Sequence, residues 1–269
     1  MERWVKMEND SVTIVIPCRN RAGFLKETLR NLMGQLSEGD EVLVVDNGSS
    51  DKLEETLEPY GDAVHVISVP HKGGWMRSGV LNRGVEAAEN DLIIVLDADT
   101  VPQPGCIKKL REAGGRGIYV SGLVLIKVPD TGKLPKLGGM RMGVVLMGTS
   151  PPEKVLDNVR EGRVQEVMGA CICFHRDDWR RVGGYTEAYD GHWGLGETDF
   201  YLKLHYAGVT LISLNKFNPV TLDGCVAVHI DNITHTKLRI TKQRLKDKEL
   251  NRQLLLSLLP RYEKGDFAP

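Results

Sequence analysis

The chain has 269 residues, a net charge of −1 and a pI near 6.7. A chain of this length can bury a substantial core without disulfide bonds, and it fits one large α/β domain better than two small ones. The near-neutral charge argues against a nucleic-acid-binding protein, because affinity for a phosphate backbone needs a basic face.

The first hundred residues alternate between short apolar runs and helix-like segments. The runs at 12–17, 41–46, 64–70 and 91–97 are rich in β-branched residues, and amphipathic stretches follow at 24–36 and 79–90. This alternation predicts a doubly wound, mostly parallel sheet flanked by helices. Ligands of such sheets bind at the carboxyl ends of the strands, where Pro17, Asp46 and Asp97 fall.

The second half is less regular. Residues 129–143 and 148–154 are rich in Gly, Pro and Lys and are predicted to be loops, and we expect the stretch 129–154 to frame an acceptor cleft. Residues 166–179 predict a strand followed by a helix. From about residue 237 the composition is helical, and residues 237–252 carry seven basic and two acidic side chains. Such a face is usually solvated, with contact to a membrane surface or a partner as the alternative.

Cysteine content and the start of the chain bear on the compartment. The five cysteines are Cys18, Cys106, Cys171, Cys173 and Cys225. An odd number without a CxxC pair suggests neither a disulfide framework nor a zinc knuckle, so we expect a reducing, cytoplasmic location. Residues 1–11 are polar and have neither a signal-peptide core nor a membrane span, which predicts a soluble, unexported protein.

Two aspartates, Asp97 and Asp99, follow the apolar run at 92–96 in the sequence LDADT. One strand end could therefore present two carboxylates to a crevice. Mg²⁺ or Mn²⁺ typically binds through one or two carboxylates together with substrate phosphates. Acidic strand ends and Asp-based turns are also common without a metal, so the pair alone leaves both interpretations open.

Several segments together resemble a known family. VTIVIPCRN, VVDNGSSD and LDADT are similar to the nucleotide-sugar glycosyltransferases of the GT-A fold, especially family 2, over most of residues 11–230. The stretch from 73 to 102, and MGACICFHRDDWRRVGGY followed by HWGLGETDF, resemble β-1,4-galactosyltransferases and their relatives. The matching positions in the first stretch are Trp75, Arg77, Leu81, Asn82, Gly84, Asp97 and Asp99.

The resemblance implies a single α/β domain of the GT-A (Rossmann-like) type. Its sheet would be mixed but mostly parallel, flanked by helices, with a helical C-terminal tail. We expect a glycosyltransferase domain over 1–236, with a nucleotide-sugar-binding half at 11–100 and an acceptor-binding half at 101–236. The tail would occupy 237–269. In the resembled group a polar segment closes over the donor, and we expect residues 230–245 to do the same.

The same resemblance implies how the donor is held. Pro17, Arg19 and Asp46 would bind the nucleoside, because a carboxylate can accept the uracil N3–H and an arginine can cover phosphate or ribose. The alternatives are a turn carboxylate at Asp46 and a plain surface role for Arg19. Arg77 is the better candidate for the diphosphate. Asp97 would contact the donor as well as the metal.

For the metal, the resemblance adds His229 to Asp97 and Asp99. A nitrogen ligand beside carboxylates suits Mn²⁺ better than Mg²⁺. A single histidine is more often a hydrogen-bonded structural residue, and His235 is a weaker rival for the ligand position.

The block HWGLGETDF offers two carboxylates for an inverting reaction. When the block is aligned with the family on Trp193 and on the Asp-Phe pair that opens the next helix, Glu197 falls at the position of the general base. Asp199 would then be a charge in the first turn of a helix over 198–208. Trp193 would give an aromatic platform to the donor and acceptor sugars, or else pack in the core. Gly169 would lie on the acceptor side. Gly196 replaces an acid that the family often has, which puts acceptor hydrogen bonding in doubt.

These expectations describe a metal-dependent transfer of a hexose or N-acetylhexosamine from a UDP-sugar to an acceptor hydroxyl. Galactose or N-acetylgalactosamine is favoured by the galactosyltransferase-like blocks, and the acceptor is unknown. One alternative is a retaining enzyme of the polypeptide N-acetylgalactosaminyltransferase type. Another is a nucleotidyltransferase or nucleotide-sugar binder, although no glycine-rich phosphate loop is present in the sequence.

Overall fold

A computed structural model describes residues 11–268 of the chain, except 75, 129–142, 148, 164–166, 168, 215–224 and 230–241. The main sheet consists of β1 (Val12–Cys18), β2 (Glu41–Asp46), β3 (His65–Ser68), β4 (Leu92–Leu96), β6 (Ile118–Ser121), β9 (Cys171–His175) and β10 (Thr210–Ser213). The strand order is β10-β6-β9-β4-β1-β2-β3. Neighbouring strands run parallel, except that β9 is antiparallel to β4 and β6. The predicted mixed, mostly parallel sheet of one α/β domain is confirmed.

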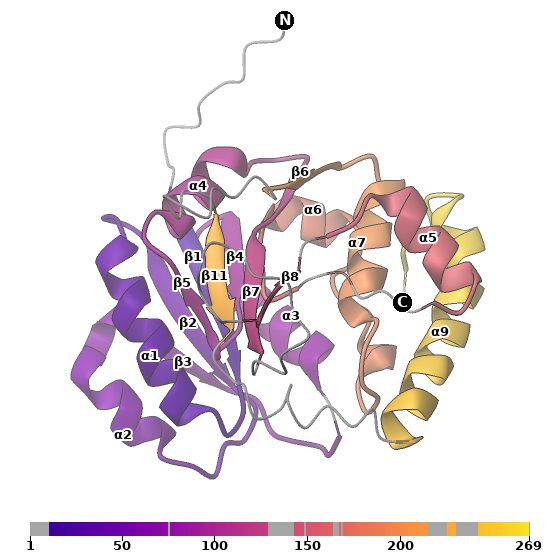
Figure 1. Cartoon of the computed structure of the whole chain (residues 1–269). Coiled ribbons are helices and arrows are strands. Elements are labelled where there is room, and N and C mark those ends of the chain that lie inside the picture. Colours follow the sequence, from indigo (N-terminus) through magenta and orange to yellow (C-terminus); the bar gives the residue numbers. More distant parts are fainter. Residues whose placement is uncertain are drawn as a thin grey trace, which may run out of the picture.

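Helices cover both faces of this sheet (Figure 1). One buried cluster joins the sheet to α1 (Ala22–Leu32), α2 (Leu53–Leu57) and α4 (Cys106–Ala113). The other joins it to α3 (Arg77–Ala87), α5 (Pro152–Arg160), α6 (Arg176–Arg181), α7 (Gly196–Tyr206) and α9 (Lys242–Tyr262). Three short 3-10 segments are η1 (Met33–Gln35), η2 (Glu58–Ala63) and η3 (Glu187–Tyr189).

Side chains along β1 alternate between the two faces of the sheet, so successive residues join different buried clusters. Ile14 and Ile16 belong to the cluster on the α1 side, whereas Val15 belongs to the cluster on the α3 side, and all three are fully buried. A strand buried on both faces reads as a continuous apolar run, which is why the first half of the sheet was predictable. Gly84 lets α3 approach closely, because a Cβ there would overlap Val15 and lie 2.9 Å from Val45 Cγ2.

A second, four-stranded sheet was not predicted. It consists of β5 (Thr100–Pro102), β11 (Val226–His229), β7 (Leu123–Val128) and β8 (Gly143–Met147), in the order β5-β11-β7-β8. The predicted loop over 148–154 is wrong from Pro152 onward, since α5 begins there. A proline fits this position because its fixed φ suits the first helical turn and its missing N–H is not needed.

All five cysteines are buried free thiols. Cys106 Sγ lies 3.3 Å from Cys225 Sγ and 3.8 Å from Cys171 Sγ, although the three come from separate parts of the chain. They belong to the apolar cluster on the α1 side of the sheet. Buried cysteines of this kind pack as small apolar side chains.

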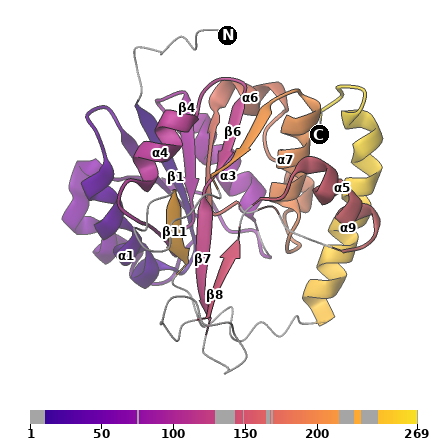
Figure 2. The ribbon, with the colours of Figure 1, turned by 45° about the horizontal axis from the view of Figure 1, so that its top comes forward.

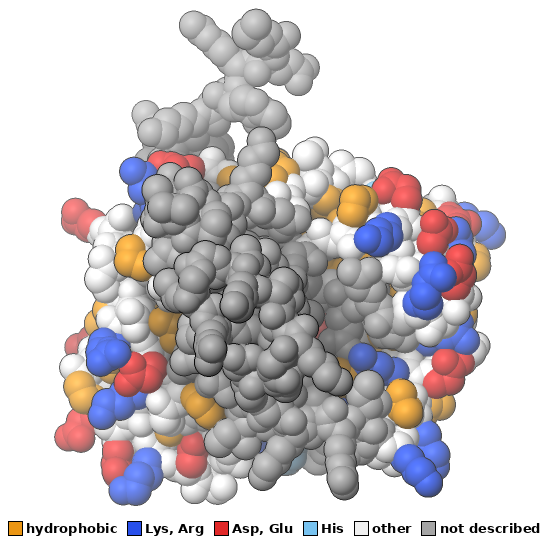
Figure 3. Space-filling view, in the orientation of Figure 1, with side chains coloured by type: hydrophobic (Ala, Val, Ile, Leu, Met, Phe, Trp, Pro, Cys, Tyr) orange, Lys and Arg blue, Asp and Glu red, His pale blue; other side chains and the backbone are white. Residues whose placement is uncertain are grey.

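The C-terminal helix α9 packs beside α5 and α7 (Figures 1 and 2). Leu255, Leu259 and Tyr262 anchor its second half in the core, while most side chains of residues 242–250 are exposed or half-buried. On the face seen in Figure 3, basic and acidic side chains are interspersed over the described surface. No helix in the described ranges is long and apolar enough to cross a membrane. The division at residue 236 stays a prediction.

Candidate active site

The carboxyl ends of β1 and β2 lie side by side, with Pro17 paired to Val45 and Cys18 paired to Asp46. The predicted nucleoside residues Pro17 and Asp46 therefore share one edge of the sheet. Asp46 Oδ1 accepts a hydrogen bond of 2.9 Å from the backbone N–H of Ser49, so it does act as a turn carboxylate. Arg19 is exposed in the turn that follows β1.

The two loops beyond these strand ends are tied together. Asn20 adopts a left-handed conformation with φ 52°, and its Oδ1 accepts a hydrogen bond of 2.7 Å from the backbone N–H of Ser50. Asp51 Oδ2 accepts one of 2.8 Å from the N–H of Ala22, at the start of α1. The loops are thus held in one arrangement at the edge of the sheet that carries Pro17 and Asp46.

Asp97 and Asp99 occupy a tight turn between β4 and β5. The backbone N–H of Asp97 donates to Ala170 O at 3.1 Å, and Thr28 Oγ1 donates to Ala98 O at 2.9 Å. The two carboxylates face different arginines: Asp97 Oδ1 lies 2.7 Å from Arg77 Nη1, and Asp99 Oδ2 lies 3.6 Å from Arg21 Nε.

The third predicted metal ligand, His229, ends β11. In the antiparallel pairing of β11 with β5 it is the register partner of Thr100, the residue after Asp99. The backbone register therefore places His229 beside the turn that carries Asp97 and Asp99. Carboxylates and an imidazole are ligand types that fit Mn²⁺, and their joint binding of a metal stays a prediction. The rival His235 and most of the predicted lid 230–245 lie outside the described residues, as does Trp75.

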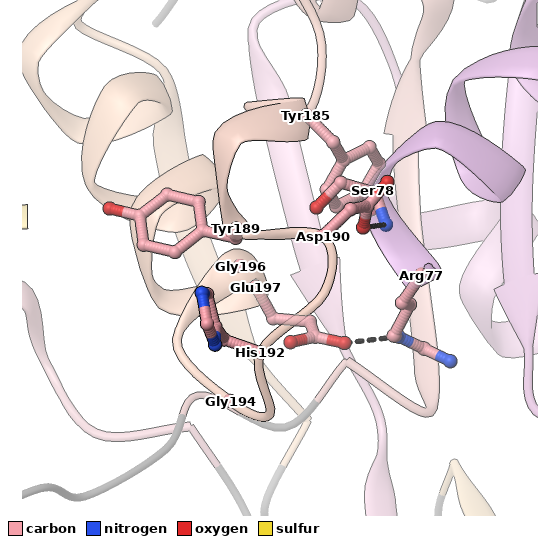
Figure 4. A pocket seen from close by; sticks show the side chains of 9 residues that line it. All are labelled: Arg77, Ser78, Tyr185, Tyr189, Asp190, His192, Gly194, Gly196 and Glu197. Atoms are coloured by element: carbon pink, nitrogen blue, oxygen red, sulfur yellow. Dashed lines mark hydrogen bonds and ion pairs between the residues drawn. The ribbon is translucent and has the colours of Figure 1, made fainter. Parts of the chain in front are cut away.

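Arg77 links the turn that carries Asp97 and Asp99, here called the D-x-D turn, to the HWGLGETDF block. Its ion pair with Glu197 is drawn in Figure 4. Besides its ion pair with Asp97, it forms one through Nε with Glu197, and its Nη2 donates to Gly169 O at 3.1 Å. Burial alone would lower the pKa of Arg77, but the two carboxylates outweigh it and raise that pKa above its usual value. Arg77 therefore remains a cation shared by a predicted metal ligand and the predicted base.

Glu197 lies inside α7, not before it as predicted, since the helix begins at Gly196 and not at residue 198. Leu195, the residue directly before the helix, adopts a left-handed conformation with φ 70°. Gly169 packs against Glu197: a Cβ at residue 169 would overlap Glu197 Cγ and lie 3.2 Å from its Cδ. The predicted acceptor-side glycine thus leaves room for the predicted base.

Asp199 has a different environment. It lies in the first turn of α7, as predicted, but it is fully buried. Its carboxylate accepts hydrogen bonds from three hydroxyl groups, those of Thr186 at 2.7 Å, Tyr189 at 3.2 Å and Tyr262 at 2.6 Å, and lies 3.8 Å from Lys203 Nζ. Burial raises the pKa of Asp199, against the effect of Lys203 and these donors. Asp199 joins α7 to α9 and has a structural role.

Trp193 is half-buried, and its ring lies under two cations of α9. Arg244 Cζ is 4.8 Å and Lys248 Nζ is 4.4 Å from the ring centroid. Cations over an indole face attract the ring electrostatically. The ring therefore contacts α9, and its predicted role as a sugar platform stays a prediction.

Sequence reasoning missed Asp190, which lies in the turn before Trp193. Its two carboxylate oxygens accept hydrogen bonds from the backbone N–H groups of Ser78 at 2.9 Å and Gly79 at 2.8 Å, at the start of α3. This anchors the helix that carries Arg77. The contact joins residues more than a hundred positions apart, so no local pattern indicated it.

Asn82, noted only as a match to the family, also proves structural. Its Oδ1 accepts from the backbone N–H of Tyr185 at 2.9 Å and from Trp179 Nε1 at 3.2 Å, and its Nδ2 donates to Tyr185 O at 2.9 Å. The amide of α3 thus holds the GGY turn in place beside the site.

The fold is an α/β domain with two aspartates in the turn after β4 and an Arg77–Glu197 ion pair beside Asp97. Comparison with known families agrees. The model of glycosyl transferase family 2 matches residues 13–182, and the N-terminal domain of galactosyltransferase matches residues 156–225. The chain belongs to glycosyl transferase family 2.

Curated relatives are enzymes of sugar transfer. The chain is 26% identical to the chondroitin synthase of Escherichia coli over 248 residues, which cover 82% of this chain and 34% of that protein. It is 28% identical to the putative glycosyltransferase EpsH of Bacillus subtilis over 128 residues, 47% of this chain and 37% of that one. The chain spans about a third of the length of these relatives.

Solved structures share the fold. GalNAc-T7 with UDP, GalNAc and Mn²⁺ has a TM-score of 0.57 at 16% identity, covering 96% of this chain and 52% of that one. A mannosyltransferase from Pyrobaculum calidifontis with GDP-Man and Mn²⁺ has a TM-score of 0.52 at 17% identity, covering 94% of this chain and 73% of that one. These likenesses confirm the GT-A fold.

Proposed function

We propose that the chain transfers a hexose or N-acetylhexosamine from a UDP-sugar to an acceptor hydroxyl, with inversion at the anomeric carbon. The observation that carries the proposal is the link from Asp97 through Arg77 to Glu197. It joins a D-x-D strand end to a half-buried carboxylate within one site. The match to a galactosyltransferase domain favours galactose or N-acetylgalactosamine, as does the likeness to a structure holding UDP and GalNAc.

The nucleoside would bind at the ends of β1 and β2. Asp46 uses Oδ1 for its own turn, and a carboxylate has further acceptor sites that could take the N3–H of uracil. Pro17 borders the same edge, and the exposed Arg19 is long enough to cover ribose or phosphate. Arg77 would give a charge-assisted contact to the diphosphate.

Asp97, Asp99 and His229 would hold the divalent cation, with Mn²⁺ preferred to Mg²⁺. Such an ion offsets negative charge on the leaving diphosphate. Solved neighbours that contain Mn²⁺ support the choice.

Glu197 would act as the general base. Its carboxylate accepts the proton of the acceptor hydroxyl as that oxygen attacks the anomeric carbon from the face opposite UDP. The bond from the sugar to UDP breaks, and the electron pair leaves with UDP. Arg77 and Gly169 fix the direction in which Glu197 points. General-base assistance of this kind typically contributes ~10²–10⁴-fold.

The acceptor side is the least constrained part of the proposal. Gly169 and Trp193 would border the acceptor, which can be a glycan, lipid, protein or small molecule. The exposed basic residues of α9 leave peripheral contact with a membrane as a further option.

Residues 230–245 would close over the bound donor. UDP with Mn²⁺ should then slow proteolytic cleavage in this segment, and unchanged cleavage would count against the closure.

Thermal unfolding in the presence of a panel of sugar nucleotides and Mn²⁺ tests the donor first, because a ligand that binds only the folded state raises the melting temperature. UDP release on addition of acceptors then tests transfer, and the anomeric proton signal of the product distinguishes inversion from retention. Absence of stabilisation by every UDP-sugar would refute the donor assignment. A product that keeps its configuration would favour the retaining alternative, to which the likeness to GalNAc-T7 gives some weight.

A further inference from the structure

Tyr185 carries a buried hydroxyl group that lacks a hydrogen-bond partner among the described residues. The side chain is 2% exposed. Buried polar groups are nearly always paired, with protein or with an ordered molecule, because an unpaired one has lost its hydrogen bonds to water. A phenylalanine would fill the same core position without this cost. The hydroxyl therefore has room for a partner other than the residues that the structure describes.

The phenol ring cannot turn to find another partner. Its ring stacks on Phe200 with centroids 4.2 Å apart and meets Phe174 edge-on at 6.5 Å. The backbone of Tyr185 is held on both its N–H and its C=O by Asn82. The direction of the hydroxyl is thus set by the core and by α3.

A small pocket lies where Tyr185 borders the site (Figure 4). Its volume is about 10 Å³, the space of one water molecule or one hydroxyl group. Its lining includes Arg77, Tyr185, His192 and Glu197. Arg77 and Glu197 belong to the site described above, and the side chains of His192, Glu197 and Arg77 reach solvent at 43%, 22% and 13% exposure.

The ionisation of Tyr185 is consistent with this position. Burial raises the pKa of its hydroxyl, while Arg77 lowers it and Glu197 raises it further. The group therefore stays protonated and can both donate and accept a hydrogen bond.

We propose that the Tyr185 hydroxyl binds one hydroxyl group of a sugar substrate in the pocket beside Glu197. The inference rests on the proposed function, which supplies the sugar. A sugar hydroxyl matches a site that offers one donor and one acceptor in a space of this size. It would complete the hydrogen bonding that the described residues leave open, and it would fix the sugar against the Arg77–Glu197 pair. The sugar can belong to the donor or to the acceptor.

The test compares Tyr185→Phe with Tyr201→Phe as the matched control. Tyr201 is equally buried, but its hydroxyl already donates to Ser150 O at 3.0 Å, and it is not part of the pocket lining. For each protein with Mn²⁺, thermal unfolding and equilibrium binding are measured in two arms. One arm compares UDP with UDP-sugars, and the other adds a panel of methyl glycosides to the UDP complex.

We expect Tyr185→Phe to bind UDP as the wild type does but to bind the sugar-bearing ligand about tenfold more weakly, in the range usual for a lost hydrogen bond. Loss in the UDP-sugar arm assigns the hydroxyl to the donor sugar, and loss in the glycoside arm assigns it to the acceptor. Without ligand, Tyr185→Phe should melt no lower than the wild type, since it removes an unpaired group, whereas Tyr201→Phe should melt lower and bind normally.

Equal affinities of Tyr185→Phe and the wild type in both arms would overturn the inference while leaving the proposed function intact. An equal loss of UDP and UDP-sugar binding would also overturn it, because it would show general damage to the site. If the wild type binds neither UDP-sugars nor glycosides, the proposed function fails and the role of Tyr185 with it.

Discussion

The two carboxylates of HWGLGETDF should respond in opposite ways to the same conservative change. Glu197→Gln and Asp199→Asn each replace a carboxylate by an amide of the same shape, two residues apart on α7. Glu197 is partly exposed and faces Arg77, whereas Asp199 is fully buried among three hydroxyl groups and Lys203. The first change should remove activity and the second should remove stability.

The magnitudes follow from these surroundings. Without its base the reaction should slow by ~10²–10⁴-fold, which corresponds to a loss of about 3–5 kcal/mol of transition-state stabilisation. Glu197→Gln should cost only about 1 kcal/mol of folding free energy, because Arg77 keeps Asp97 at 2.7 Å and Gly169 O at 3.1 Å. Asp199→Asn leaves the buried Lys203 without its counter-charge, which typically costs about 3–5 kcal/mol. For a chain of this size that is a fall in Tm of roughly 6–20 °C.

The assay is UDP release with Mn²⁺, with donor and acceptor saturating, at a temperature well below both melting transitions, together with thermal unfolding of each variant. Rates are normalised to the folded fraction. The reasoning is refuted if Glu197→Gln turns over like the wild type, in which case a retaining course gains support. It is equally refuted if Asp199→Asn melts with the wild type but loses turnover, since the roles would then be exchanged.

Three further predictions concern the surroundings of the site. Gly169→Ala should lower turnover by at least about tenfold with little change in UDP binding, because the new Cβ displaces the Glu197 side chain; unchanged turnover in the UDP-release assay would contradict this. Chelation of divalent ions should abolish UDP release, Mn²⁺ should restore it, and Asp99→Asn should weaken that rescue, as measured by Mn²⁺ titration. Gly84→Ala should cost about 1–3 kcal/mol through overlap with Val15 and Val45, so Tm should fall by roughly 2–12 °C in thermal unfolding.

The first half of the fold was predictable because its signals are local. The strands β1, β2 and β4 are buried on both faces, so each appears in the sequence as a short apolar run, and their carboxyl ends necessarily meet at one edge. The second sheet was not predictable from local signals, because β7 and β8 flank a segment whose glycine and proline content indicated only a loop. Strand β11 is four residues long, too short for its alternation to be recognised.

The site was predictable only as separate pieces. The positions of Asp97, Arg77 and Glu197 followed from the resemblance, but their ion pairs connect elements that are up to 120 positions apart. The same holds for Asp190, whose carboxylate meets the start of α3. For Trp193 a local pattern suggested a role but not the contacts. An aromatic residue beside glycines suggests a sugar platform, yet two cations of α9 lie over its ring.

The separation of roles within HWGLGETDF follows from helix geometry. Successive residues of an α-helix are rotated by about 100°, so Glu197 and Asp199 project about 200° apart once both lie inside α7. One must then face the site when the other faces the core. In an extended strand, by contrast, two residues at this spacing would share a face. The helix begins at Gly196, directly after the left-handed Leu195, so both carboxylates lie on it. Their opposite directions account for why Glu197 meets Arg77 while Asp199 is buried against Tyr262.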